Sequence, residues 1–267
     1  IEQVAGYVRR NPEKYVGFAG IDPMDPQCMQ QFRDAMDLGL AGVTISPAAG
    51  GYHPTHSRAL RLYEHCEAAN LPVMIHTAMQ LANLTKMEFA QPYLLDEVAR
   101  TFPELRIVLA RVGHPWVQQT LVLIGKHQHV YAELSDVISR PWELYTLLLS
   151  SHQQHVIDHL LLGTDFPFFT PEKAITALYS VNMLIQGTNL PSVPREQLRG
   201  IVERDALSCL GITSPVSGQN GAQPMPEVRQ DPKNPNSTQR PTETDDRTQS
   251  AGEQDQIKSP TVKEDIR

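Results

Sequence analysis

The chain has 267 residues, of which 40% are hydrophobic, and a formal net charge of −7. This size and composition suit a single α/β domain with a sizeable core, and the acidic balance without a Lys/Arg cluster argues against a nucleic-acid or anionic-membrane partner. No apolar stretch reaches the roughly 18 residues that a membrane span needs. We therefore expect a small-molecule substrate.

The three cysteines, Cys28, Cys66 and Cys209, are scattered and form no C-x-x-C pair. An odd number without such a motif predicts free structural thiols rather than a disulfide framework. This favours a reducing compartment, and we expect a cytoplasmic protein. Ile1 already lies in a helical pattern that leads into a strand, so we expect part of the functional machinery to precede this sequence.

Short apolar runs alternate with helical patterns along the chain. The runs are 15–21, 40–45, 71–76, 105–110, 130–134 and 159–163, and the helical patterns are 26–38, 57–69, 92–101, 116–126 and 142–155. Such alternation predicts an α/β fold with parallel strands joined by crossover helices. Beyond the last run, Thr170 before Pro171 and Glu172 predicts another helix start, with Thr170 as its N-cap.

Two of the predicted strands lead into residues that can ligate a metal. His76 ends the run 71–76, and Asp165 follows the run 159–163. Because strand ends meet at one face of a β/α barrel, these residues point to a hydrolytic metal site. Each also has a structural alternative: His76 as a hydrogen-bonded core residue, and Asp165 as a cap of the loop that follows it.

From about Thr213 the composition changes. The segment to Arg267 has no aromatic residue, is rich in Pro, Gln, Ser, Thr and acidic residues, and shows no periodicity. It cannot bury enough apolar surface to offset its ordering entropy. We therefore predict a folded domain over 1–212 and a disordered tail over 213–267.

Four segments carry a resemblance to a known family. They are YVGFAGIDP at 15–23, LPVMIHT at 71–77, FPELRIVLARVGHPW at 102–116 and LGTDFP at 162–167. Their order and spacing resemble the amidohydrolase-related metal-dependent hydrolases, the group that includes aminocarboxymuconate-semialdehyde decarboxylase and other aromatic-acid decarboxylases. The resemblance extends from the start of the chain to about Ile212.

The resemblance implies a distorted (β/α)8 TIM barrel, with strands three to eight present and strands one and two absent from this chain. It also implies a divalent metal, usually Zn²⁺ with Mn²⁺ as the alternative. In that family a His-x-His pair ends strand one, a His ends strand five and an Asp ends strand eight. His76 and Asp165 match the last two positions, so the implied metal ligands in this chain are His76 and Asp165.

One position departs from the family pattern. Gly113, Pro115 and Trp116 keep the register of the family's His-x-Gly segment, which places Arg111 where the family has a catalytic His. Arginine cannot shuttle protons near neutral pH, but it can bind a carboxylate or stabilise an oxyanion. His114 is the candidate to take over part of the lost role, with a loop histidine without chemistry as the alternative.

Three further residues are candidate substrate contacts beside Arg111. Trp116 and Phe166 either line an apolar pocket or pack against the barrel. His53 lies in a loop after the run 40–45, on the catalytic side, and is either a substrate contact or an exposed loop residue.

We expect a metal-dependent hydrolase in which a metal-activated water attacks a small-molecule carbonyl. Asp165 would move the proton, and Arg111 or His114 would hold the developing oxyanion. The alternatives are a non-oxidative decarboxylase of a small cyclic or aromatic acid, and a non-catalytic relative that has lost its metal. A homodimer is the default assembly.

Overall fold

The structure is a computed structural model, and it describes residues 1–78 and 83–213. These residues belong to one compact unit, Ile1–Pro224. The predicted tail lies outside the described residues, except for Thr213.

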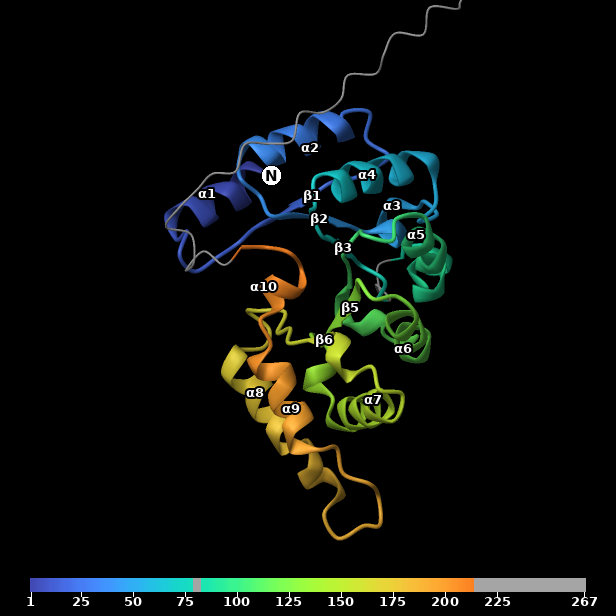
Figure 1. Ribbon diagram of the computed structural model, residues 1–267, viewed down its shortest axis with the longest axis vertical. Coiled ribbons are helices and arrows are strands. Elements are labelled where there is room, and N and C mark those ends of the chain that lie inside the picture. Colours follow the sequence, from blue (N-terminus) through green and yellow to red (C-terminus); the bar gives the residue numbers. More distant parts are fainter. Residues whose placement is uncertain (79–82, 214–267) are drawn as a thin grey trace, which may run out of the picture. The chain divides into compact units, whose positions relative to one another are not determined.

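The core of the fold is a six-stranded parallel sheet whose strands follow one another in chain order (Figure 1). The strands are β1 (Phe18–Gly20), β2 (Gly42–Ile45), β3 (Val73–Ile75), β4 (Ile107–Leu109), β5 (Val130–Glu133) and β6 (Leu160–Leu161). Each lies within, or within one residue of, a predicted apolar run, and all are shorter than predicted. The predicted α/β class with parallel strands is confirmed.

Helices connect the strands and also follow the last one. The α-helices are α1 (Glu2–Arg10), α2 (Cys28–Asp37), α3 (Pro47–Gly50), α4 (Ser57–Ala68), α5 (Leu95–Thr101), α6 (Val117–Lys126), α7 (Pro141–Gln153), α8 (Pro171–Ser180), α9 (Arg195–Glu203) and α10 (Ala206–Cys209). Short 3-10 turns are η1 (Met87–Ala90), η2 (Pro92–Leu94), η3 (Ala110–Gly113), η4 (Val137–Ser139), η5 (Ile157–His159) and η6 (Val181–Ile185). The predicted helix 92–101 therefore begins as a 3-10 turn. Thr170 caps α8 as predicted, because its hydroxyl accepts a hydrogen bond from the Lys173 N–H at 3.4 Å.

The two faces of the sheet bury different residues. Val43, Ile45, Val73, Ile75, Ile107 and Leu109 lie in the main core, on the face that packs against helices. The opposite face, here called the inner face, carries the row Gly20, Thr44, Met74, Val108 and Tyr131, which lie side by side in the strand register. Leu210 and Ile212 pack against the inner face near Val108 and Leu161. Both faces are thus covered, which explains why the runs are apolar on consecutive residues.

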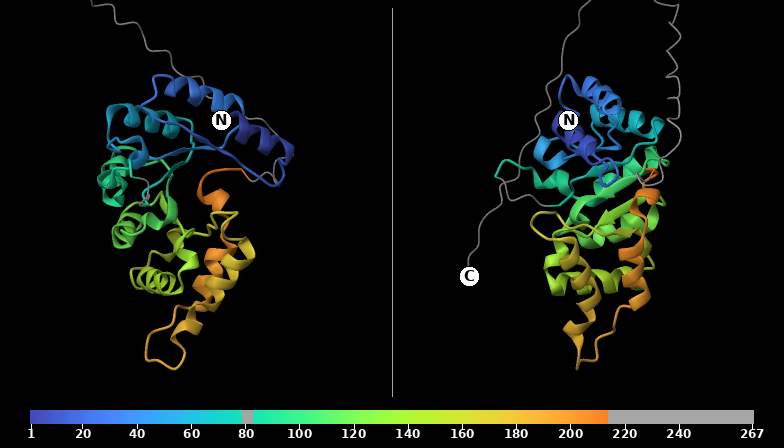
Figure 2. Two further views of the ribbon diagram at one scale, coloured as in Figure 1. Left: turned by 180° about the vertical axis from the view of Figure 1, so that it is seen from behind. Right: turned by 90° about the vertical axis from the view of Figure 1, so that its left-hand side faces the viewer.

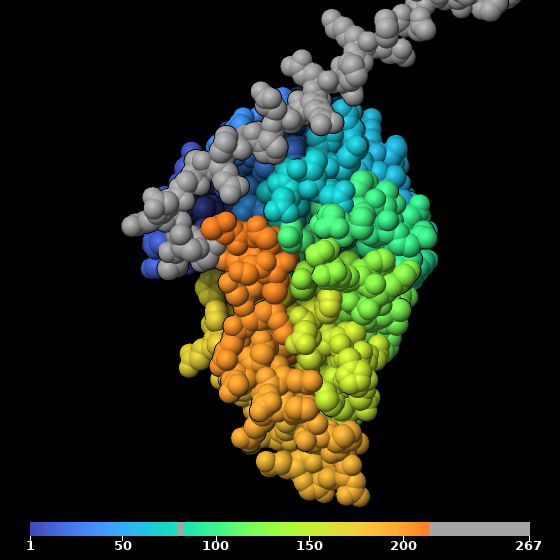
Figure 3. Space-filling view, in the orientation of Figure 1, coloured from blue at the N-terminus to red at the C-terminus, as the bar shows by residue number. Residues whose placement is uncertain are grey.

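The views agree on this arrangement. Helices α5, α6 and α7 lie along one side of the sheet and α10 along the other (Figures 1 and 2). In the space-filling view, the orange segment that carries α9 and α10 lies against the yellow-green segment of the chain near β6 (Figure 3). Within the described residues, no helix combines the length and apolarity that crossing a membrane requires.

Candidate functional site

The carboxyl ends of the first three strands bring polar side chains to the inner face. Asp22, Ser46 and His76 each lie two residues beyond a member of the inner row, and side chains alternate along a strand with a period of two. The parallel pairing continues to this point, since the His76 N–H donates to the Ile45 carbonyl at 3.0 Å. These three residues therefore face one common space.

That space is a cavity of about 470 Å³ at the ends of β1, β2 and β3 and beside α3. Its polar lining includes Asp22, Thr44, Tyr52 and His76. It lies where ligands bind in parallel α/β sheets, outside the carboxyl ends of the strands. The cavity is thus a candidate binding site with an imidazole at its wall.

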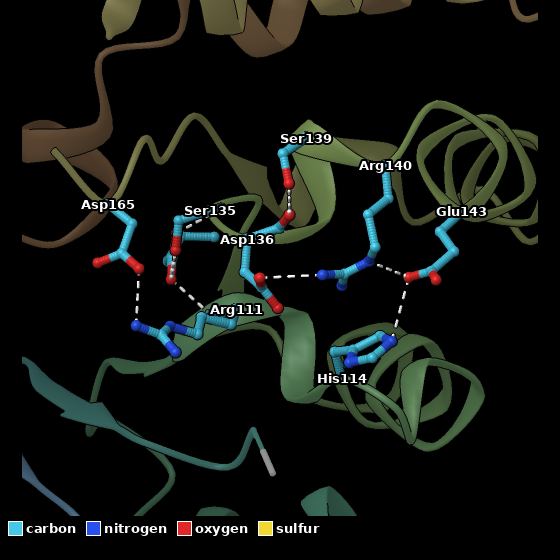
Figure 4. A network of polar contacts seen from close by, with 9 residues as sticks. Arg111, His114, Ser135, Asp136, Ser139, Arg140, Glu143 and Asp165 are labelled. Carbon is cyan, nitrogen blue, oxygen red and sulfur yellow. Dashed lines mark hydrogen bonds and ion pairs between the residues drawn. The ribbon is translucent and has the colours of Figure 1, made fainter. Parts of the chain in front are cut away.

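Arg111 and Asp165 form an ion pair in the same part of the molecule (Figure 4). Nη2 of Arg111 donates to Oδ2 of Asp165 at 2.6 Å, a short charge-assisted hydrogen bond. The two side chains are 36% and 35% exposed, so solvent and small ligands can reach both. The sequence-predicted residues Arg111 and Asp165 are therefore brought into direct contact.

His76 links this ion pair to the cavity. Burial lowers the pKa of the His76 imidazole below its usual value of 6.5, the positive charge of Arg111 lowers it further, and Asp165 acts in the opposite direction. His76 is consequently neutral at neutral pH. One of its ring nitrogens can then donate a hydrogen bond, and the other can accept one.

A left-handed turn aims Arg111. Three consecutive residues after β4, Arg111, Val112 and Gly113, have φ values of 54°, 53° and 62°. This conformation is costly for a β-branched residue such as Val112, by roughly 1–2 kcal/mol. The hydroxyl of Thr120 donates to the Val112 carbonyl at 2.8 Å and supports the turn. Strain held in place by buried contacts is typical of functional segments.

Glu133, which sequence reasoning missed, anchors the same turn from the end of β5. Its Oε1 accepts from the Arg111 backbone N–H at 2.5 Å, and its two oxygens accept from the N–H and hydroxyl of Ser135 at 2.7 Å each. Burial raises the pKa of the Glu133 carboxyl, and the hydrogen bonds oppose this shift. The sequence did contain a signal for Glu133: it is a charged residue in an otherwise apolar run, two positions beyond Tyr131 and therefore on the inner face.

His114 faces a different group of residues (Figure 4). Its Nε2 lies 3.1 Å from Oε2 of Glu143 on α7. Nε of Arg140 donates to the same Glu143 oxygen at 2.5 Å, and its Nη1 donates to Asp136 at 2.9 Å. The structure thus joins His114 to a structural network rather than to Asp165.

The other candidate substrate contacts lie apart from the cavity lining. Phe166 is 70% exposed. Trp116 is half-buried at the start of α6. Nδ1 of His53 lies 2.8 Å from the Thr55 hydroxyl, and its ring meets Phe89 edge-on with centroids 6.0 Å apart. None of the three lines the cavity described above.

The donor set can be tested against the implied metal. Among the described residues, no group of three or more His, Cys, Asp or Glu side chains is arranged to hold an ion. Of the two implied ligands, Asp165 already accepts a hydrogen bond from Arg111. His76 and Asp165 supply only two donors, fewer than the three or more that protein zinc sites use, so the residues described in this chain do not fit a metal by themselves.

Comparison with known proteins places the chain in a family. The family profile described as amidohydrolase matches residues 1–204. No curated protein gives a significant match.

Several solved structures are similar in fold. An uncharacterised TIM-barrel protein from Bordetella bronchiseptica has a TM-score of 0.61 at 21% identity, covering 79% of this chain and 72% of its own. The 5-carboxyvanillate decarboxylase of Sphingomonas paucimobilis has a TM-score of 0.57 at 16% identity, with 79% and 71% covered. A dihydroxybenzoic acid decarboxylase from a Polaromonas species, with bound manganese and the inhibitor 2-nitroresorcinol, has a TM-score of 0.56 at 15% identity, with 79% and 73% covered. The family profile covers most of the chain and the fold is consistent with it, so the chain belongs to the amidohydrolase family.

Proposed function

We propose that this chain is a non-oxidative decarboxylase of a small cyclic or aromatic carboxylic acid, and that Arg111 binds the acid's carboxylate. The observation that carries the proposal is the 2.6 Å contact between Arg111 and Asp165 beside His76. A guanidinium that already holds a carboxylate in a partly exposed site has the geometry to hold a substrate carboxylate instead.

The relatives support this reaction class over the hydrolase that the sequence first suggested. Two of the solved structures described above are aromatic-acid decarboxylases by name. We also infer that the six strands correspond to strands three to eight of an eight-stranded barrel, because His76 and Asp165 then take the family's strand-end positions.

The proposed reaction starts with an exchange of partners at Arg111. The incoming carboxylate takes over hydrogen bonds of the guanidinium from Asp165, so that two carboxylates face one cation. In this proposed step Asp165 takes up one proton from solvent as the substrate carboxylate replaces it at Arg111, and a neutral acid then faces the substrate.

The protonated Asp165 then supplies the proton that the reaction needs. It adds to the ring carbon that bears the carboxylate, the bond from that carbon to the carboxylate breaks, and its electron pair restores the ring as CO₂ leaves. Asp165 then returns to Arg111 as a carboxylate, so atoms and charge balance with one solvent proton consumed per CO₂. His76, neutral and half-buried, orients the ring by a hydrogen bond.

The Polaromonas relative holds manganese. The specific prediction of Zn²⁺ at His76 and Asp165 remains a prediction. Because the described donors do not fit an ion by themselves, the steps above use only the chain's own side chains.

The test is turnover of carboxyl-labelled hydroxybenzoates by the 267-residue chain in D₂O. We expect labelled CO₂, with one deuterium on the carbon that lost it. Asp165→Asn should abolish turnover, because an amide cannot deliver the proton. Arg111→Lys should raise KM roughly 10-fold or more, whereas Arg199→Lys, in an exposed ion pair with Glu203, should change nothing.

A second candidate is a carboxylate-binding relative without catalytic activity. Arg111, which stands where the family has a catalytic His, favours it. Binding of benzoates that depends on Arg111, without release of CO₂ from any acid tested, would decide for this candidate.

A further inference from the structure

The cavity beside His76 contains a buried hydroxyl that has no partner among the described residues. Tyr52 is 5% exposed and lines the cavity, and its hydroxyl oxygen makes no hydrogen bond to any described residue. Buried polar groups in folded proteins are almost always hydrogen-bonded, so such an orphan calls for a ligand or a water. Burial also raises the pKa of Tyr52 well above its usual value, so the hydroxyl keeps its proton.

A second orphan lies on the neighbouring strand. Oγ1 of Thr44 is buried, belongs to the cavity wall and likewise has no hydrogen-bond partner among the described residues. Thr44 is on the inner face of β2, and Tyr52 follows α3, so two elements offer hydroxyls to one space. The cavity thus has two unused groups that can each donate and accept.

The acidic side chain in the cavity wall determines whether the carboxylate end or the hydroxyl end of a ligand can bind there. Asp22 lies in the wall, and one of its oxygens accepts from the Met24 N–H at 2.9 Å. The lining contains no Lys or Arg. A carboxylate would be repelled by Asp22, whereas a hydroxyl can donate to Asp22 and accept from Tyr52 or Thr44.

We propose that this cavity is a subsite for a hydroxyl group, with Tyr52, Thr44 and Asp22 as specificity-determining residues. It accepts the hydroxyl of a ring-bearing acid whose carboxylate lies on Arg111, with His76 between the two ends. The inference rests on the proposed acid binding at Arg111, and it adds the chemistry of the other end of the substrate. Sites built to hydrogen-bond a hydroxyl reject analogues that lack it, because their buried polar groups then stay unpaired.

The experiment is calorimetric titration of the 267-residue chain with matched acids: benzoate, its three monohydroxy isomers and the corresponding methyl ethers. We expect one hydroxy isomer to bind roughly 3- to 10-fold more tightly than benzoate, the usual gain from one hydrogen bond. Its methyl ether should lose this gain, because an ether cannot donate to Asp22.

Variants test whether the tighter binding of the hydroxy isomer comes from the cavity. Tyr52→Phe should remove it and leave benzoate binding unchanged. Tyr63→Phe is the matched control, because the Tyr63 hydroxyl is also buried with no partner in the described part of the chain but does not line the cavity. Asp22→Asn, at an exposed position that tolerates substitution, should reduce the same gain and provides a second test if Tyr52→Phe folds poorly.

The results separate this inference from the proposed function. If no hydroxy isomer exceeds benzoate, or if the gain survives both Tyr52→Phe and Asp22→Asn, the subsite is wrong. An equal loss in Tyr63→Phe would also overturn it. Benzoate binding that depends on Arg111 would, in each of these cases, leave the proposed acid binding intact.

Discussion

Arg111 occupies its position because several residues hold its backbone while leaving its guanidinium accessible. The Glu133 carboxylate accepts a hydrogen bond from the Arg111 N–H, and the Thr120 hydroxyl donates one to the Val112 carbonyl. Gly163 gives Glu133 the room it needs, since a Cβ at Gly163 would lie within 1.9 Å of Oε2 of Glu133. The position of the cation therefore depends on a glycine 52 residues away in the chain.

Gly163→Ala tests this dependence on space. The new methyl group would force the Glu133 carboxylate out of place, and overpacking of this kind costs about 1–3 kcal/mol. Urea denaturation should show that loss. Gly6→Ala is the control, because nothing lies within 4 Å of its added Cβ and alanine stabilises a helix by about 0.5–1 kcal/mol. Equal stabilities of Gly163→Ala and the wild type would refute the account.

Glu133 should also give the folding stability a pH dependence. Burial raises its pKa above the usual 4.5, so the folded state binds this proton more tightly than the unfolded chain. The resulting stabilisation is complete below about pH 4.5 and is lost as the pH rises through the folded-state pKa. The unfolding free energy of the wild type should thus fall relative to that of Glu133→Gln over this interval. A constant difference across the interval would contradict the raised pKa.

At the scale of elements, helix α8 shows how local sequence defines a boundary. Thr170 caps the helix, Pro171 occupies the first turn and Glu172 adds a favourable charge there. This helix follows the loop that carries Asp165, so its start fixes one end of that loop.

Thr170→Ala should lower the stability by about 1 kcal/mol, because it removes an acceptor for a helix N–H. Thermal unfolding followed by circular dichroism measures the change. Thr176→Ala in the same helix is the control, since the Thr176 hydroxyl donates to the Glu172 carbonyl and alanine has the higher helix propensity. A loss as large in Thr176→Ala as in Thr170→Ala would show that the cap itself contributes little.

The elements could be predicted from the sequence, because strands buried on both faces give continuous apolar runs and helix starts have characteristic residues. The left-handed turn at Arg111 could not, since Val112 is β-branched and disfavours a positive φ. The predicted helix at 92–101 lies where the sequence placed it, but its first residues, Pro92–Leu94, form a 3-10 turn and only Leu95–Thr101 is α-helical.

The candidate site could be proposed from the sequence in part. His76 and Asp165 stood out because they end or follow apolar runs and match a family pattern, and their roles remain a prediction. The contact between Arg111 and Asp165 joins residues 54 apart, and no local pattern encodes such a pairing. The Tyr52 hydroxyl could not be predicted either, since only the packing around it shows that it is buried with no partner among residues 1–78 and 83–213.

At the scale of the whole molecule, parallel strands in chain order bring all these residues to one end of the sheet. Asp22 and His76 line the cavity there, and the charges of Arg111 and Asp165 act on the His76 imidazole. The chain is acidic overall, with a net charge of −7, so an anionic substrate depends on local attraction by Arg111 rather than on the field of the molecule.

The central claim is that Asp165 and a substrate carboxylate compete for Arg111. The most direct measurement is the dissociation constant of benzoate for the wild-type chain and for Asp165→Asn, by isothermal titration calorimetry at neutral pH. Asp158→Asn is the control, because Asp158 forms a comparable ion pair with Arg204 away from the site.

If the exchange occurs, Asp165→Asn should bind benzoate roughly 10-fold more tightly, since the competing charge-assisted hydrogen bond is weakened by about 1.5 kcal/mol. Asp158→Asn should bind as the wild type does. Unchanged or weaker binding by Asp165→Asn would contradict the competition for Arg111.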